Sequence, residues 1–147
     1  MIALIQRVSR SSVDVGGTKI AGIGPGMTIL LGVFRDDSEA EIERLMKKIP
    51  HLRIFADEAG RMNRSLIDIG GEALVVSQFT LAGDLRKGRR PGFDAAMPPE
   101  EAKRLYEHFC KRLTGYVPVQ TGRFGAMMEV EILNDGPVTF ILDSREL

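Results

Sequence analysis

Several residue types are scarce in this chain, and each scarcity excludes a class of protein. The 147 residues include one cysteine, Cys110, two histidines and no tryptophan. A single cysteine cannot form an internal disulfide, and no Cys/His cluster is present that could hold a structural zinc ion. We therefore expect a protein of a reducing compartment that binds no metal and needs no cofactor.

Charge of one sign and long hydrophobic runs are also missing. Lys and Arg number 20, as do Asp and Glu, so the formal net charge is zero. This balance excludes a basic nucleic-acid-binding arm and an acidic tail. No apolar stretch approaches the ~20 residues that a membrane helix needs. We expect a cytoplasmic protein with neither a membrane nor DNA among its partners.

What is present is typical of one folded domain. Hydrophobic residues make up 44% of the chain, and 16 glycines with 7 prolines fall short of a low-complexity composition. A chain of this length buries roughly two-thirds of its unfolded surface around one core. Residues 1–147 are therefore predicted to form a single domain.

Glycine pairs and apolar runs predict a sheet of many short strands. Gly16-Gly17 is typical of a two-residue hairpin turn, and the apolar run 27–34 is typical of a central strand buried on both faces. Further strands are predicted at 2–8, 12–15, 18–23, 52–56, 73–79, 117–119, 127–133 and 138–142, the last two joined by a turn at 134–137.

Two segments have the spacing of helices. Ser38 and Glu41 form a capping box ahead of apolar positions that recur until Pro50. The second segment begins at Pro98-Pro99 and ends at Gly115. Two main helices outside a mostly antiparallel curled sheet or partial barrel make the predicted fold class α+β.

Polar residues gather where one buried strand ends. The segment Ser77-Gln78-Phe79-Thr80-Leu81 combines two hydroxyls and an amide, and strand ends often carry functional sites. The same residues also serve as ordinary turn formers. A hydroxyl nucleophile needs a base, and neither His51 nor His108 has the sequence context of a held triad partner. Cys110 and Met127-Met128 are expected in the core.

Four cations fall within five positions of one loop. The usual interpretation of such a run is a solvated surface, but beside a site-bearing strand it would also match phosphates. Composition leaves both interpretations open. The four residues are Arg86, Lys87, Arg89 and Arg90.

Four segments taken together resemble the signature blocks of the D-aminoacyl-tRNA deacylases. They are SQFTL at 77–81, RKGRRPGF at 86–93, TGRFGA at 121–126 and NDGPVT at 134–139. The resemblance extends over essentially the whole chain. It implies a homodimeric cytosolic enzyme that hydrolyses the ester joining a D-amino acid, or glycine, to the 3′ end of tRNA, and so proofreads chirality in translation.

The resemblance also implies how the ester is hydrolysed. Backbone amides around Phe79 and Thr80 would stabilise the oxyanion, while Ser77 and Gln78 would order the site. The neighbouring ribose 2′-hydroxyl would take part, because an aminoacyl ester is already activated and needs little more than positioning.

Binding roles are implied in the same way. A cis Gly136-Pro137 pair, inserted from the partner subunit, would read handedness, although base rates alone predict a trans bond there. The cation loop would bind tRNA through Arg86, Lys87, Arg89 and Arg90. Further substrate-binding residues would be Phe124, Gly125 and Ala126.

Two other functions compete on the residues alone. A non-catalytic module that binds an RNA end or a small ligand would use the cations of 86–90 without chemistry. A general serine esterase would use Ser77 or Thr80 with His108 and would accept simple esters.

Overall fold

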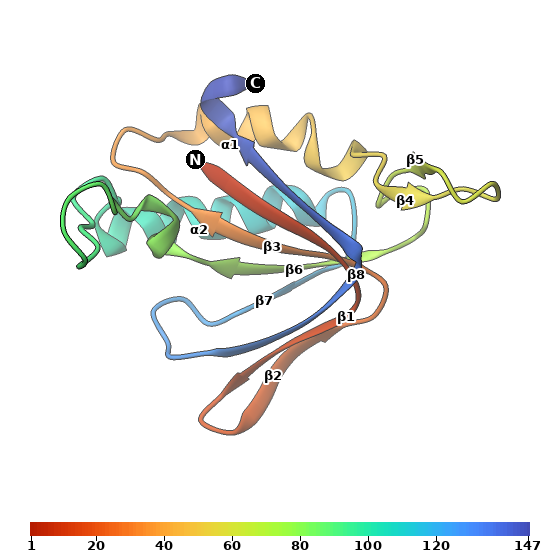
Figure 1. The fold of residues 1–147 in the computed structure, drawn as a ribbon, viewed down its shortest axis with the longest axis horizontal. Coiled ribbons are helices and arrows are strands. Elements are labelled where there is room, and N and C mark those ends of the chain that lie inside the picture. The colour runs from red at the N-terminus through yellow and green to blue at the C-terminus, as the bar shows by residue number, and fades with distance from the viewer.

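A six-stranded mixed sheet organises the chain in the computed structural model, which describes residues 1–147 (Figure 1). Its order is β2-β1-β3-β6-β7, with β8 paired to β1. Neighbours are antiparallel except in the parallel pairs β3–β6 and β6–β7. The strands are β1 (Ile2–Val15), β2 (Thr18–Ile23), β3 (Gly26–Gly32), β6 (Glu72–Ser77), β7 (Val119–Thr121) and β8 (Glu129–Asp143).

The sheet curls until its two ends approach each other. Strand β2 contacts both β6 and β7, which lie at the opposite end of the strand order, so the sheet is a nearly closed barrel. A small core fills the inside of the curl and draws on β1, β2 and β6. The curled sheet with two main helices confirms the predicted fold class.

Two helices pack over one face of the sheet (Figure 1). They are α1 (Glu39–Met46) and α2 (Pro99–Thr114), and the main core lies between them and β1, β3 and β6. Gly115 caps the end of α2, as its sequence indicated. None of the helices has the length and apolar character needed to span a membrane.

Short elements complete the chain. A small hairpin of β4 (Phe55–Ala56) and β5 (Met62–Arg64) extends from the body (Figure 1) and replaces the longer strand predicted at 52–56. Three 3-10 turns are η1 (Ile49–His51), η2 (Phe79–Ala82) and η3 (Ser144–Glu146).

The predicted turn at 134–137 is wrong. Strand β8 runs continuously from Glu129 to Asp143 and pairs with β1 along both halves, with irregular register around Val8. The Asn134 side chain donates hydrogen bonds to the carbonyls of Arg7 and Val138, which holds the segment as a bulge beside β1. Similarly, β1 is one long strand where two were predicted.

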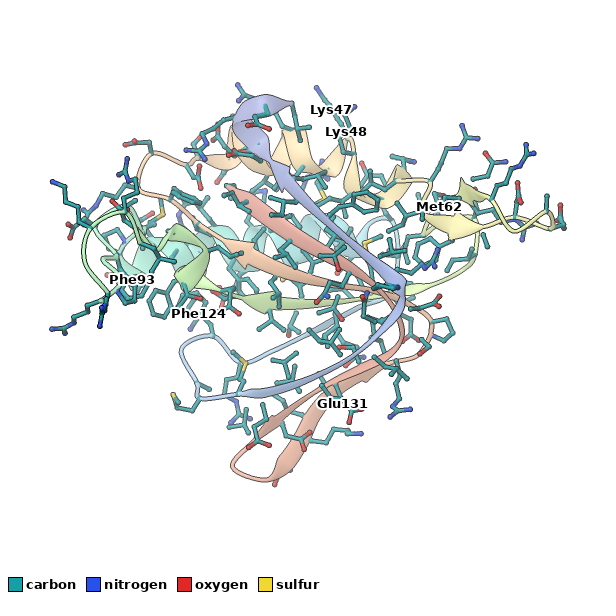
Figure 2. The ribbon with its side chains drawn as sticks, viewed as in Figure 1. Lys47, Lys48, Met62, Phe93, Phe124 and Glu131 are labelled. Carbon is teal, nitrogen blue, oxygen red and sulfur yellow. The ribbon has the colours of Figure 1, made fainter.

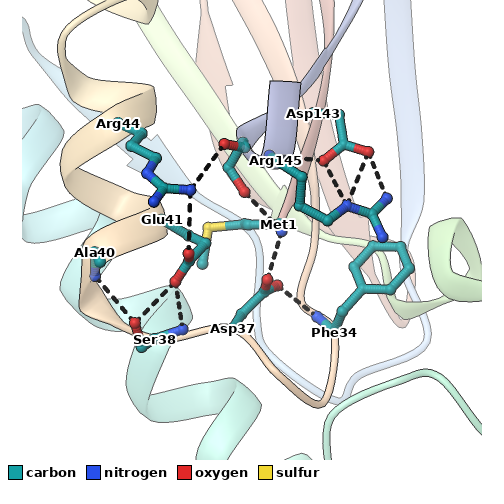
Figure 3. A network of polar contacts seen from close by, with 10 residues as sticks. Met1, Phe34, Asp37, Ser38, Ala40, Glu41, Arg44, Asp143 and Arg145 are labelled. Atoms are coloured by element: carbon teal, nitrogen blue, oxygen red, sulfur yellow. Dashed lines mark hydrogen bonds and ion pairs between the residues drawn. The ribbon is translucent and has the colours of Figure 1, made fainter. Parts of the chain in front are cut away.

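The start of α1 is fixed by the predicted capping box (Figure 3). The Ser38 hydroxyl accepts from the Ala40 amide, and the Glu41 carboxylate accepts from the Ser38 amide at 2.7 Å. The Ser38 backbone hydrogen bond is the main cause that lowers the pKa of Glu41. Because the folded pKa is lowered, this contribution to stability is present at neutral pH and is lost as the pH falls through that pKa.

We expect Ser38→Ala to lower the free energy of unfolding by about 1 kcal/mol, because an uncapped helix start leaves amides without partners. Urea denaturation measures this change. Ser9→Ala, on an exposed part of β1, is the control and should change stability by less than about 0.5 kcal/mol. Equal effects in both variants would contradict the assigned cap.

The two ends of the chain meet in a buried polar network (Figure 3). The α-ammonium of Met1 lies 2.6 Å from Asp37 Oδ1 and 2.9 Å from Ser144 Oγ. The second carboxylate oxygen of Asp37 accepts from the Phe34 amide at 2.7 Å. The ammonium has no exposed surface and the Asp37 side chain has 5%, so this ion pair is a buried one.

Candidate active site

A pocket of about 550 Å³ opens where β6 leaves the sheet. Two segments form most of its wall: the end of β6 with the start of η2, and the connection between β7 and β8. Figure 2 shows Phe124, from that connection, at the same end of the molecule as η2. The pocket is lined by Val33, Val76, Ser77, Gln78, Phe79, Thr80, Pro99, Ala102, Phe124, Gly125, Ala126, Met127, Met128 and Val130.

The pairing of strands in the sheet positions the polar residues of this pocket. Because β3 and β6 are parallel, both end at the same edge, where the Gln78 amide donates to the Leu31 carbonyl at 2.8 Å. Gly32 lets η2 approach closely, since a Cβ at that position would lie 2.8 Å from Leu81 Cβ. The predicted segment 77–80 therefore lines the pocket as one unit.

The polar groups of the pocket are neutral. The Gln78 side-chain amide donates to the Thr80 hydroxyl. The first N–H groups of a helical turn have no partner within it, and no side chain caps η2 at Gln78. No ionisable side chain lines the pocket. Its chemistry therefore depends on hydroxyl, amide and backbone groups.

The β7–β8 connection supplies the opposite wall. It is anchored by the Gly122 amide, which donates to the Val75 carbonyl at 3.0 Å. A turn follows, in which the Ala126 amide donates to the Arg123 carbonyl at 3.1 Å. Gly125 has a φ of +76° with open space around it, a conformation that suits glycine. The predicted residues Phe124, Gly125 and Ala126 thus face the segment 77–80.

The histidines lie elsewhere. His108 Nδ1 is 3.7 Å from Glu39 Oε1, on the side of α2 that faces α1, and His51 packs edge-on against Tyr116. Neither lines the pocket, which argues against the serine esterase with His108. Cys110 is buried as expected, and burial raises the pKa of its thiol to about 12.

The cation loop is exposed and only partly neutralised. Arg86 forms a two-point ion pair with Asp84 and holds the pKa of that carboxyl at about 2. Lys87, Arg89 and Arg90 form no ion pair. The loop adjoins the pocket because the Phe93 ring lies 5.0 Å from the Phe79 ring, edge to face.

Gly136 and Pro137 lie far from the pocket of their own chain. The strand register aligns this part of β8 with Val8 of β1 and, through β3, with Glu72 at the start of β6. The pocket lies beyond Ser77 at the other end of β6, roughly 16 Å away at the usual rise of a strand. The Gly136-Pro137 bond is cis, so the base-rate expectation of a trans bond is wrong.

Arg7 holds this segment and had no role assigned from the sequence. Its Nε donates to the Asp135 carbonyl at 3.1 Å and lies 3.2 Å from the Asp135 carboxylate. Its Nη1 donates to the Ile54 carbonyl at 2.7 Å. An arginine within a strand pattern gives no signal of such contacts, because the partners are distant in sequence.

The family described as D-Tyr-tRNA(Tyr) deacylase matches residues 4–143. The chain is 60% identical to a D-aminoacyl-tRNA deacylase of a Nitratiruptor species and 62% identical to one of Persephonella marina, over 100% of each chain. This chain belongs to the D-aminoacyl-tRNA deacylase family. It is therefore a hydrolase of tRNA editing that deacylates D-aminoacyl-tRNA, which excludes the non-catalytic binding module.

Solved structures agree with the D-aminoacyl-tRNA deacylase fold. One titled "c-Myc DNA Unwinding Element Binding Protein" has a TM-score of 0.92 and 46% identity, covering 97% of this chain and 98% of that chain. A probable eukaryotic D-amino acid tRNA deacylase has a TM-score of 0.83 at 17% identity, covering 96% and 97%, and supports the fold alone.

Several pocket residues of this deacylase were not predicted from the sequence. Val33 follows β3, while Pro99 and Ala102 belong to the first turn of α2, and in the sequence they look like ordinary positions of a strand and a helix. Met127 was expected in the core, but its side chain is 91% exposed at the rim of the pocket. An exposed methionine next to a site is a flexible apolar contact for a ligand.

Proposed function

We propose that the pocket holds the aminoacylated 3′-terminal adenosine of tRNA and hydrolyses its ester without a side-chain base. The observation that carries this proposal is a pocket with hydroxyls, an amide and uncapped backbone N–H groups, but no ionisable side chain. Its volume is within the usual range of small-molecule sites. The reaction proposed takes place in the cytoplasm.

In the proposed reaction, water attacks the ester carbonyl while the ribose 2′-hydroxyl assists proton transfer. The amides of Phe79 and Thr80 stabilise the oxyanion as it develops. The bond between the carbonyl carbon and the ribose 3′-oxygen then breaks, and that oxygen takes a proton. The products are the free D-amino acid and tRNA with a free 3′-hydroxyl.

Gln78 and Thr80 have positioning roles in this proposal. The Gln78 amide donates to the Thr80 hydroxyl, which leaves the hydroxyl proton available to point into the pocket. Ser77 ends the buried strand and orders the same wall. These neutral groups orient substrate and water without changing charge during the reaction.

The proposed active unit is a homodimer in which Gly136-Pro137 of one subunit enters the pocket of the other. The pair's distance from its own pocket supports this arrangement. Strand β8 also has an outer edge that pairs with no strand, and it exposes Leu133, Phe140 and Ile141. Exposed apolar side chains beside an open strand edge are typical of a surface that a second subunit covers.

Backbone recognition accounts for the proposed substrate range. Carbonyls and a glycine can fix the α-ammonium and the space beside the α-carbon for any side chain, whereas a side-chain pocket would select one amino acid. D-Amino acids are therefore accepted broadly and L-amino acids rejected. Glycine has no handedness, so glycyl-tRNA is also expected to be hydrolysed.

The mechanism is tested with D-tyrosyl-tRNA whose terminal adenosine lacks the 2′-hydroxyl. We expect its hydrolysis to be slower by more than about tenfold, because proton transfer loses its assisting group. His108→Ala should keep the wild-type rate on normal D-tyrosyl-tRNA, with or without a chelator. An undiminished rate on the 2′-deoxy substrate, or a large loss in His108→Ala, would contradict the mechanism.

The proposed tRNA-binding role of the cation loop predicts a change in salt dependence. Replacing Arg89 and Arg90 with glutamine should weaken tRNA binding and flatten its logarithmic salt slope by roughly one to two units. Selectivity for D- over L-aminoacyl-tRNA should not change. Arg86→Gln is the comparison, because Asp84 already neutralises that side chain. If the salt dependence of tRNA binding were unchanged in the Arg89 and Arg90 variant, the loop would be solvent-exposed without contacting tRNA.

A further inference from the structure

A second pocket adjoins the candidate active site and shares one residue with it. It has a volume of about 370 Å³ and lies between α2 and the β7–β8 connection. Phe124 lines both pockets. A ligand longer than one nucleotide could therefore continue from the first pocket into the second. The lining residues are Lys103, Tyr106, Glu107, Cys110, Thr121, Gly122, Arg123 and Phe124.

The inner wall of this second pocket is uncharged. The Tyr106 hydroxyl donates to the Val75 carbonyl at 2.8 Å, and burial raises the pKa of both Tyr106 and Cys110. The rings of Tyr106 and Phe124 lie 5.8 Å apart at 45°. Tyr106 is buried beneath Phe124, so Phe124 is the ring that this pocket offers for stacking of a nucleobase.

Two cations stand at its mouth on opposite walls. Lys103 comes from α2 and Arg123 from the β7–β8 connection. Arg123 forms no ion pair, and Lys103 has only a loose one with Glu107, at 3.8 Å between two side chains more than half exposed. Two cations against one carboxylate favour a bound phosphodiester.

We propose that the second pocket binds the penultimate nucleotide of the tRNA 3′ end. This inference rests on the proposed function, because the terminal adenosine must occupy the first pocket. The phosphodiester that joins the last two nucleotides lies between Lys103 and Arg123, and the penultimate base packs on Phe124. That base is cytosine in tRNA, and the Glu107 carboxylate is the kind of acceptor that pairs with its 4-amino group.

A cytidine nucleotide in the second pocket accounts for the presence of both cations and a carboxylate at its opening. A site for phosphate alone gains nothing from a carboxylate beside the lysine, whereas a cytidine nucleotide has both an anion and an amino donor to place. The loop 86–90 has three unpaired cations and no aromatic partner among them, which suits the phosphates of a duplex stem better than one stacked nucleotide.

The test compares the binding of the dinucleotide CpA with that of UpA and of adenosine, measured by calorimetry on the whole protein. Wild type should bind CpA about tenfold more tightly than adenosine, because CpA alone adds the phosphodiester contacts together with the cytosine. UpA should fall between the two. In Lys103→Gln/Arg123→Gln the affinity for CpA should drop to about that of adenosine, which itself stays unchanged.

Lys47→Gln/Lys48→Gln is the matched control. It removes two exposed cations that lie well away from Phe124 (Figure 2), so the net charge changes equally while the preference for CpA should stay. The same variants are assayed on D-tyrosyl-tRNA, where loss of Lys103 and Arg123 should raise KM about tenfold and change kcat less than about twofold.

Equal binding of CpA and adenosine by wild type would overturn the proposal, as would a preference for CpA that survives in Lys103→Gln/Arg123→Gln. Failure of the proposed function gives a different result. In that case wild type hydrolyses the 2′-deoxy form of D-tyrosyl-tRNA unimpaired, whatever the calorimetric preference.

Discussion

Gly136→Ala is expected to lower the rate of D-tyrosyl-tRNA hydrolysis by about 100-fold, and that of glycyl-tRNA equally. Gly136 has a φ of +136°, and a Cβ there would lie 2.6 Å from Val138 Cγ2 and 3.2 Å from Arg7 Nη2. The segment must shift to admit the methyl group. A displacement of about 1 Å in a positioned site costs about two orders of magnitude in rate.

Initial rates on both substrates measure this effect, and urea denaturation shows that the variant still folds. Gly17→Ala is the matched control. Gly17 also has a positive φ, +79°, but no atom lies within 4 Å of the added Cβ. That variant should lose about 1 kcal/mol of stability and keep its activity. Wild-type rates in Gly136→Ala would refute the role given to this glycine.

Asp37→Ala is expected to lower the free energy of unfolding by about 3–5 kcal/mol. The substitution leaves the Met1 ammonium buried with the Ser144 hydroxyl as its remaining partner, and a buried charge without a counter-ion is strongly destabilising. It also removes the acceptor for the Phe34 amide. Urea denaturation gives the change from the shift in midpoint at constant slope.

Asp36→Ala is the control for this prediction, because Asp36 is the exposed neighbour and forms no ion pair. Its stability should stay within about 0.5 kcal/mol of wild type. A loss below about 1 kcal/mol in Asp37→Ala would mean that water or another group compensates the ammonium.

Local signals in the sequence predicted the elements whose cause is local. The hairpin at Gly16-Gly17 follows from two positive φ angles, and the start of α1 follows from Ser38 and Glu41. The buried run that became β3 needed only its continuous hydrophobicity. In each case the physical cause lies within a few residues of the structure that it produces.

Elements decided by distant partners could not be predicted in this way. Asp135-Gly136 has the composition of a tight turn, but pairing of both flanks with β1 keeps β8 continuous. The strand predicted at 117–119 begins at Val119, and Val117 is instead a buried anchor in the core. A local pattern carries no information about which strand pairs across a sheet.

The residues of the candidate site also fall into those that a sequence pattern could predict and those that it could not. Residues 77–80 were indicated by their polar side chains at a strand end and by the family resemblance, residues 124–126 by the resemblance alone, and both segments line one pocket. Val33 and Ala102 were not, since an apolar side chain that lines a pocket has the same sequence pattern as one that fills a core. Arg7 was missed because its partners, Ile54 and Asp135, are distant in sequence.

The separation of Gly136-Pro137 from the pocket in the same chain has a consequence for the amount of enzyme in a cell. In the proposed dimer, each reaction centre is completed by a neighbour, so a newly synthesised copy edits nothing until it meets another. At protein concentrations so low that most subunits are monomers, the concentration of the dimer, and with it the rate of deacylation, grows with the square of the subunit concentration. Dilution therefore lowers the activity by dissociating the dimer, while the subunits remain folded.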